Sequence, residues 1–324
     1  MITGVTEMKK ISVVIPCYND SASVRQMHER LTNVFANKLP EYDYDITFCD
    51  DRSPDDGNTW NEIKKVCAID KKCRAVRNVR NFGIYRNPFA AMRYGNGDAV
   101  FMIYGDIQDP PEYLPEMVAH WQNGHKVVLG VRQNQYYNAF FTIMRNMYYG
   151  IISKLTSNQQ IVGASSFGLY DRSFVDILHD IDDVQPILTG VVTEYASDIK
   201  VIQVTLEKGG RDGKSNLNFW GKYDTAMVSF TSYTKMLLRL CTFIGLIIGA
   251  LSFIFAVWVF IMKILNWDSY PLGIPALTVG MFFLGAVQLF FLGIIGEYIL
   301  AINNRSIKRP LTAVDEYINF EDKI

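Results

Sequence analysis

Residues 11–20 read ISVVIPCYND, a short apolar run that ends at Pro16 and is followed at once by polar side chains. Such a run is typical of a strand buried on both faces of a parallel sheet. Strand-like and helix-like patterns then alternate as far as residue 135. The expected strands are 11–16, 44–50, 74–79, 99–104 and 127–131, and the expected helices are 21–36, 57–68 and 88–94. This alternation predicts an α/β domain built on a mostly parallel sheet.

Polar side chains gather where two of these strands end. Residues 50–53 read DDRS, and residues 106–112 read DIQDPPE. Ligands of parallel sheets bind at the carboxyl ends of strands, where carboxylates suit sugar hydroxyls and a hard divalent cation. Each cluster taken alone also fits a plain turn. The chain contains neither GxGxxG nor GxxxxGK[ST], so a dinucleotide oxidoreductase or a P-loop ATPase is not expected.

Composition narrows the class of protein. The chain has 324 residues, of which 49% are hydrophobic and 20% charged, with a formal net charge of −1. That charge balance excludes a globally basic nucleic-acid binder. The 5 cysteines are odd in number and form no CxxC pair, which favours a reducing compartment over a disulfide scaffold. Residues 1–10 are polar, so no secretory signal peptide is expected.

Two long uncharged stretches, 240–262 and 269–296, predict a transmembrane hairpin with spans at about 238–262 and 272–298. A pair of buried core helices is the alternative. Basic residues flank the hairpin on its chain-terminal sides, so the positive-inside rule places both termini in the cytosol. They are Lys235, Arg239, Arg305, Lys308 and Arg309. The expected division is a cytosolic domain at 1–235, a membrane part at 236–302 and a cytosolic tail at 303–324.

Five stretches together resemble family 2 glycosyltransferases of the GT-A fold. They are VVIPCYND (13–20), DDRSPDDG (50–57), RNFG (80–83), GDAVFMIYGDIQDPPE (97–112) and GVR (130–132). The DIQDPPE stretch and the C-terminal hairpin are similar to the polyprenyl-phosphate glycosyltransferases, which include dolichol-phosphate mannose synthases and bacterial undecaprenyl-phosphate enzymes. The resemblance implies a multi-pass plasma-membrane enzyme. It would transfer a sugar from a UDP-sugar, such as UDP-glucose, to a polyprenyl phosphate for modification of cell-envelope glycans.

The resemblance also implies roles for particular residues. Asp106 and Gln108 would hold Mg²⁺ or Mn²⁺ and the diphosphate, and Asp51 would hold the uracil or ribose. The remaining nucleotide-sugar residues would be Pro16, Tyr18, Asp20, Ser53, Arg80, Asn81 and Gly83. The catalytic residues would be Asp106, Gln108 and Arg132. The acceptor phosphate would be bound by Arg132, Arg145, Arg211, Lys214 and Ser215.

The sequence departs from the family pattern at two places. Tyr104 stands where the family usually has the first Asp of Asp-x-Asp. Residues 165–168 read SSFG in place of Gly-Asp-Phe-Arg, so an acid–base charge pair near the sugar pocket is absent. We interpret these changes as altered donor specificity, with loss of activity as the alternative.

A lipid-phosphate acceptor removes the need for a catalytic base. The second pKa of a phosphate monoester is about 6, so the nucleophile is already ionised at neutral pH. A single displacement at the anomeric carbon then inverts its configuration, and basic residues offset the repulsion between two anions.

Two aromatic segments, near 136–153 and 216–235, are expected to be amphipathic interfacial helices, with ordinary core helices as the alternative. Two spans per chain are also compatible with a homo-oligomer. A processive polysaccharide synthase is a competing interpretation, although residues 185–189 lack its Q-x-x-R-W motif. A membrane-tethered binding protein with a decayed site is another.

Overall fold

The structure is a computed structural model that describes residues 8–133, 161, 164–183, 186–207, 236–265, 274–306 and 310–320. The chain divides into two compact units. One unit comprises Met1–Asn216 together with Lys308–Ile324, and the other comprises Leu217–Ile307. The boundary between domain and membrane part, predicted at residues 235 and 236, falls within the second unit.

The first unit is built on one sheet whose eight strands follow the order β7-β5-β6-β4-β1-β2-β3-β8. Strands β6 and β8 run antiparallel to their neighbours and the other pairs are parallel, so the sheet is mixed. The strands are β1 (Lys10–Cys17), β2 (Asp43–Asp50), β3 (Cys73–Asn78), β4 (Ala99–Met102), β5 (Val127–Gln133), β6 (Ala164–Asp171), β7 (Ile199–Thr205) and β8 (Val314–Ile318).

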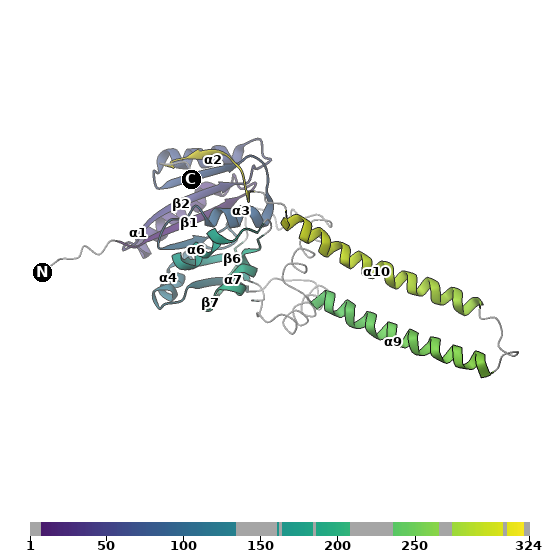
Figure 1. Ribbon diagram of the computed structural model, residues 1–324. Coiled ribbons are helices and arrows are strands. Elements are labelled where there is room, and N and C mark those ends of the chain that lie inside the picture. Colours follow the sequence, from purple (N-terminus) through teal and green to yellow (C-terminus); the bar gives the residue numbers. More distant parts are fainter. Residues whose placement is uncertain are drawn as a thin grey trace. The chain divides into compact units, whose positions relative to one another are not determined.

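Helices cover both faces of this sheet, as Figure 1 shows. Alternate side chains of β1 enter different apolar clusters: Val13 and Ile15 join one, and Val14 joins the other. The first cluster lies under α1 (Val24–Lys38), α2 (Asn58–Ile69) and α4 (Leu114–Gln122), with the 3₁₀ turn η1 (Pro111–Tyr113) preceding α4. The second lies under α3 (Gly83–Met92), α6 (Arg172–Asp180) and α7 (Leu188–Tyr195). The predicted α/β architecture is therefore confirmed.

The strand order places a topological switch point beside β1. From β1 the chain moves outward through β2 and β3, and β4 then pairs with the opposite side of β1. Ligands of open α/β sheets bind in the crevice at the carboxyl ends of the strands at such a point. The residues that follow β1 and β4 are those of the predicted site, including Asp20 and Asp106.

The second unit contains two long apolar helices, α9 (Met236–Leu265) and α10 (Ile274–Ser306). Within the described part of the chain, one window, Phe283–Leu300 of α10, is long and apolar enough to cross a membrane, and none of it is buried. Large apolar side chains are exposed on both helices, for example Phe255 and Leu289. A membrane-spanning helix is thus supported by length and composition in α10, and the two-span hairpin stays a prediction.

The C-terminal segment was expected to be a tail, but part of it belongs to the sheet. Residues Val314–Ile318 form β8, which pairs with β3 in antiparallel register. In Figure 1 this strand, coloured yellow, lies beside the purple-blue N-terminal half of the sheet. Residues 307–313 separate it from the end of α10. The last strand in the sequence therefore completes the sheet formed by the first three.

Candidate active site

The loop after β1 is held by hydrogen bonds to its own backbone. Asp20 is 4% exposed, and its Oδ2 accepts a 2.8 Å hydrogen bond from the Tyr18 amide. The Asp20 amide donates to Thr59 Oγ1 at 3.0 Å, which ties the loop to α2. Asn19 adopts a φ of 65°, a left-handed conformation that asparagine tolerates better than most residues. Tyr18 and Asp20, both predicted to contact the nucleotide, are thereby placed at the carboxyl end of β1.

The loop after β2 is joined to the loop after β1. Ser53 Oγ donates to Asp50 Oδ1 at 2.6 Å and accepts from the Asn19 amide at 2.9 Å. The Asp51 amide donates to the Cys17 carbonyl at 3.0 Å. Ser53, another predicted nucleotide residue, therefore links the two loops.

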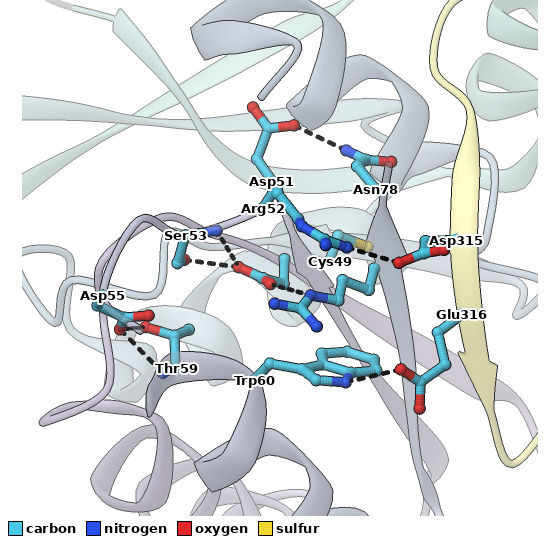
Figure 2. A network of polar contacts seen from close by, with 12 residues as sticks. Cys49, Asp51, Arg52, Ser53, Asp55, Thr59, Trp60, Asn78, Asp315 and Glu316 are labelled. Carbon is cyan, nitrogen blue, oxygen red and sulfur yellow. Dashed lines mark hydrogen bonds and ion pairs between the residues drawn. The ribbon is translucent and has the colours of Figure 1, made fainter. Parts of the chain in front are cut away.

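Asp51 organises the RNFG segment. Its carboxylate is 3% exposed and accepts from Asn78 Nδ2 at 2.8 Å, the Phe82 amide at 2.9 Å and the Gly83 amide at 2.8 Å. The contact with Asn78 is drawn in Figure 2. Gly83 has a φ of 91°, a conformation that favours glycine, which brings its amide to the carboxylate. In this structure Asp51 thus meets protein donors, and its contact with uracil or ribose stays a prediction.

Burial dominates the protonation of the two aspartates that end β2. Desolvation raises the pKa of Asp50, although hydrogen bonds from Ser53 and the nearby Arg77 act in the opposite direction. Desolvation likewise raises the pKa of Asp51 against the hydrogen bonds from Phe82, Asn78 and Gly83. Both carboxylates are therefore costly to keep charged and need the donors around them.

The loops after β1 and β4 meet at Gly105. Its amide donates to the Pro16 carbonyl at 3.1 Å, and its carbonyl accepts from Ser23 Oγ at 2.5 Å. A Cβ at this position would lie 2.9 Å from Cys17 Sγ and 3.0 Å from Asp20 Oδ2. Only glycine fits without a shift of the neighbours, so the Asp20 carboxylate packs directly against the residue that precedes Asp106.

A strained residue lies between the two predicted metal ligands. Ile107 has a φ of 58°, which is a real outlier for a β-branched residue, and its side chain is 6% exposed in the apolar core. Asp106 and Gln108 on either side are half-buried, and the Gln108 amide donates to Asp106 Oδ1 at 3.3 Å. The Gln108 carbonyl accepts from the Glu207 amide at 3.0 Å. Burial of Ile107 thus keeps both polar neighbours at the surface of the site.

The chemistry of this donor set fits a magnesium or manganese ion. Asp106 supplies a carboxylate and Gln108 an amide oxygen, which are hard oxygen ligands, and Mg²⁺ commonly takes one or two carboxylates plus substrate phosphates. Tyr104, at the place of the missing acid, packs against the second apolar cluster. Among the described residues a different grouping, His28, Asp70 and Cys73, brings its ligand atoms within 4.8 Å of one another. It lies at the amino end of β3, at the sheet edge opposite the site.

The other predicted residues are distributed unevenly. Pro16 is buried at the end of β1, Asn81 is exposed, and the Arg80 guanidinium lies 5.1 Å from the centre of the Phe82 ring. Arg132 lies near the carboxyl end of β5, in register with Val204 of β7. Four predicted acceptor residues and both predicted interfacial segments fall outside the described residues: Arg145, Arg211, Lys214, Ser215, 136–153 and 216–235.

Sequence reasoning missed several residues that hold the site. Thr59 anchors Asp20, and Ser23 anchors Gly105. Arg77 approaches Asp50, with Nε 3.4 Å from Oδ2. None of the three belongs to a motif, and Thr59 and Arg77 each lie next to an asparagine in the sequence, so no local pattern distinguishes them from ordinary surface residues.

Comparison with known proteins identifies the family. Residues 12–178 match the family described as Glycosyl transferase family 2. The chain is 31% identical over 307 residues to the Bacillus subtilis (strain 168) protein CsbB, covering 94% of this chain and 91% of that protein. It is 28% identical over 303 residues to the bactoprenol glucosyl transferase of Shigella phage SfV, covering 93% and 96%. The prophage bactoprenol glucosyl transferase homolog of Escherichia coli (strain K12) is 26% identical over 303 residues. The chain therefore belongs to glycosyltransferase family 2 and is a glycosyltransferase.

Proposed function

We propose that this enzyme transfers a sugar, with UDP-glucose as the first candidate donor, to a polyprenyl phosphate such as undecaprenyl phosphate. The observation that carries the proposal is the joining of three loops, after β1, β2 and β4, at the switch point of a family 2 sheet. Relatives named bactoprenol glucosyl transferase, aligned over 93% of the chain, support a polyprenyl acceptor and a glucosyl donor.

The donor nucleotide would bind in the loops after β1, β2 and β3. Asp20 and Ser53 hold these loops through their hydrogen bonds, and the RNFG segment closes the third side through Asp51. Within that segment, exposed Arg80 and Asn81 offer a guanidinium and an amide. The donor diphosphate would extend toward Asp106 and Gln108 after β4.

Asp106 and Gln108 would hold Mg²⁺ or Mn²⁺ together with diphosphate oxygens. Such an ion supplies positive charge that stabilises the nucleoside diphosphate as it leaves. The side chains themselves orient the diphosphate and limit the freedom of the sugar. Orientation of this kind is a large part of catalysis when no proton has to be moved.

The acceptor phosphate would act as the nucleophile without a base. A phosphate oxygen forms the new bond to the anomeric carbon while the bond from that carbon to the diphosphate oxygen breaks, and the electron pair leaves with the diphosphate. The configuration of the anomeric carbon inverts. Arg132 at the end of β5 would contact the acceptor phosphate, with Arg145, Arg211, Lys214 and Ser215 completing the clamp.

The apolar helices would bind the enzyme to the membrane that contains its lipid acceptor. We propose that α9 and α10 form a membrane hairpin with both chain termini in the cytosol. The proposal rests on the exposed apolar side chains of both helices and on the basic residues Lys235, Arg239 and Arg305 at their cytosolic ends.

A donor panel tests the proposed function. Membranes containing the full chain are incubated with undecaprenyl phosphate and, in turn, UDP-glucose, other UDP-sugars and GDP-mannose, and lipid products are read by mass spectrometry. One donor should yield a monoglycosylated polyprenyl phosphate, and NMR of that product should show an inverted anomeric configuration. Failure of every donor, or formation of a polymer, would refute the proposal. Membranes carrying Asp106→Asn provide the control for background transfer.

A further inference from the structure

The C-terminal strand β8 reaches the part of the sheet that carries the predicted donor loops. It pairs with β3, with Glu316 opposite Arg77 and Tyr317 opposite Val76. The strand is anchored just past its end by Asn319, whose Nδ2 donates to the carbonyls of Cys67 at 2.9 Å and Cys73 at 2.8 Å. Its register is therefore set by side-chain contacts as well as by the ladder.

One series of contacts runs from β8 to a buried aspartate of the site. Glu316 Oε2 accepts from Trp60 Nε1 at 3.0 Å, as Figure 2 shows, and Trp60 is 2% exposed. The guanidinium of Arg77 lies 5.6 Å from the centre of a Trp60 ring, a cation–π distance. Arg77 Nε in turn lies 3.4 Å from Asp50 Oδ2. Glu316 thus holds the indole against which Arg77 packs while Arg77 faces Asp50.

The series continues into the donor loops. Asp50 Oδ1 accepts from Ser53 Oγ at 2.6 Å, and Ser53 Oγ accepts from the Asn19 amide at 2.9 Å. The remaining Asp50 oxygen, Oδ2, is buried and has no hydrogen-bond partner within the described part of the chain, so its charge depends on the nearby arginine. Loss of that arginine's position would leave a buried carboxylate uncompensated, and the loops that it holds would shift.

A second contact reaches the same loop from the neighbouring residue of β8. Arg52 Nη1 donates to Asp315 Oδ2 at 2.5 Å, as Figure 2 shows. Arg52 has a φ of 55° and lies between Asp51 and Ser53, the two residues that bind the adjoining loops. Because successive strand residues point to opposite sides, Asp315 contacts the loop after β2 whereas Glu316 contacts α2.

We propose that β8 is a positioning element of the donor site, with Glu316 and Asp315 as positioning residues that act through Trp60, Arg77, Asp50 and Arg52. The inference rests on the proposed function, because it assigns the loops after β1 and β2 to the donor nucleotide. A strand that merely protects the edge of the sheet would need pairing with β3 but neither acidic side chain.

Hydrogen exchange tests the positioning without any ligand. The full chain in detergent is compared with Glu316→Ala, Glu316→Gln and Asp176→Asn, the last of which breaks the exposed Arg172–Asp176 pair elsewhere in the same unit. In Glu316→Ala the amide of Asn19 should exchange at least tenfold faster, while the amide of Ala196, bonded to Val192 in α7, should not change. Glu316→Gln keeps an acceptor for Trp60 and should restore protection, and Asp176→Asn should match the wild type. Unchanged exchange at Asn19 in Glu316→Ala overturns the inference.

Nucleotide binding gives the second readout. The Kd for UDP should rise about five- to tenfold in Glu316→Ala and less in Asp315→Asn, while the KM for polyprenyl phosphate should stay within twofold. An equal rise in the Kd for UDP and in the KM for polyprenyl phosphate would indicate general unfolding and overturn the inference. Absence of binding by the wild type to UDP or to any other nucleotide tested would instead refute the proposed function, whereas wild-type binding with unchanged variants would refute only the role of β8.

Discussion

Ser53 Oγ accepts a 2.9 Å hydrogen bond from the amide of Asn19, so this hydroxyl links the loop after β1 to the loop after β2. The same hydroxyl donates to the buried Asp50 at 2.6 Å. Asn19 is in the left-handed region, with a φ of 65°, and the hydrogen bond helps to hold it there. The shape of the predicted donor site therefore depends in part on a contact between two residues 34 positions apart in the chain.

Replacing Asp106 should remove transfer while preserving the fold. Asp106→Asn keeps the shape of the side chain and its contact with the Gln108 amide but loses the charge that suits a divalent cation. Turnover should fall by roughly a hundredfold or more, since electrostatic stabilisation of the leaving group is lost. Product formation is measured across a titration with Mg²⁺ and with Mn²⁺. Thermal unfolding is measured as well, and the unfolding temperature should match that of the wild type. Near-normal turnover would show that Asp106 is not a metal ligand.

Adding a methyl group at Gly105 should disturb both the fold and the site. Gly105→Ala places a Cβ 2.9 Å from Cys17 Sγ, closer than Cβ atoms approach in proteins, and 3.0 Å from Asp20 Oδ2, which is a tight contact. Overpacking of this kind costs about 1–3 kcal/mol, and donor binding should weaken because Asp20 must move. The measurements are denaturant unfolding and UDP affinity. The double variant Cys17→Ala/Gly105→Ala removes one of the two clashes and should recover part of the stability; no recovery would contradict this account.

The stability that the ionised Asp171 side chain contributes should be lost in acid. Burial opposes its ionisation, but hydrogen bonds from Ser173, Trp121 and Lys126 outweigh burial and lower its pKa from 3.8 to about 2. Because the folded pKa is lowered, this contribution is present above pH 4 and is lost as the pH falls toward 2. Asp171→Asn should therefore cost on the order of 1–2 kcal/mol at pH 7, after allowance for solvent screening, and less at pH 2.5. Equal destabilisation at both pH values, measured by denaturant unfolding, would rule out the charge as its origin.

Arg132 should matter more for the acceptor than for the donor. It lies near the carboxyl end of β5, and a guanidinium offers a planar fork of donors to a phosphate. Arg132→Ala should weaken use of polyprenyl phosphate by roughly ten- to a hundredfold, as expected for loss of a charge-assisted hydrogen bond. UDP binding without lipid, measured by calorimetry, should hardly change, and Arg132→Lys should recover part of the loss. Weaker UDP binding with unchanged dependence on the lipid concentration would indicate that Arg132 binds the donor diphosphate instead.

Both chain termini should lie in the cytosol. The basic residues Lys235, Arg239 and Arg305 lie at the outer ends of the two apolar helices, and between Arg239 and Arg305 the sequence contains one basic residue, Lys263, near the end of α9. Reporters fused at the C-terminus should be active only on the cytosolic side, and reporters inserted near residue 268 only on the external side. A C-terminal reporter active outside the cell would overturn the hairpin.

The sequence was informative about elements and about motifs. Apolar runs such as 11–16 and 44–50 predicted strands that the structure places at Lys10–Cys17 and Asp43–Asp50. The DDRS and DIQDPPE stretches indicated the carboxyl edge of the sheet, and the structure brings their loops to one edge through Gly105 and Ser53. The helix expected at 88–94 begins earlier, at Gly83, because the Asp51 carboxylate accepts the hydrogen bond of the Gly83 amide.

The amino-acid sequence by itself therefore determined the alternation of strands and helices, the family and the apolar stretches. Buried faces of strands and helices produce a local periodicity of apolar residues, and each motif lies within a few consecutive residues. Tertiary structure alone decided three features: the pairing of β8 with β3, the hydrogen bonds that occupy Asp51, and the left-handed backbone of Ile107. Asp315 and Arg52 are 263 residues apart, and no local pattern marks either as the partner of the other. Such a contact requires the closing of a long loop, and the packing of the rest of the sheet must offset the entropy that this costs.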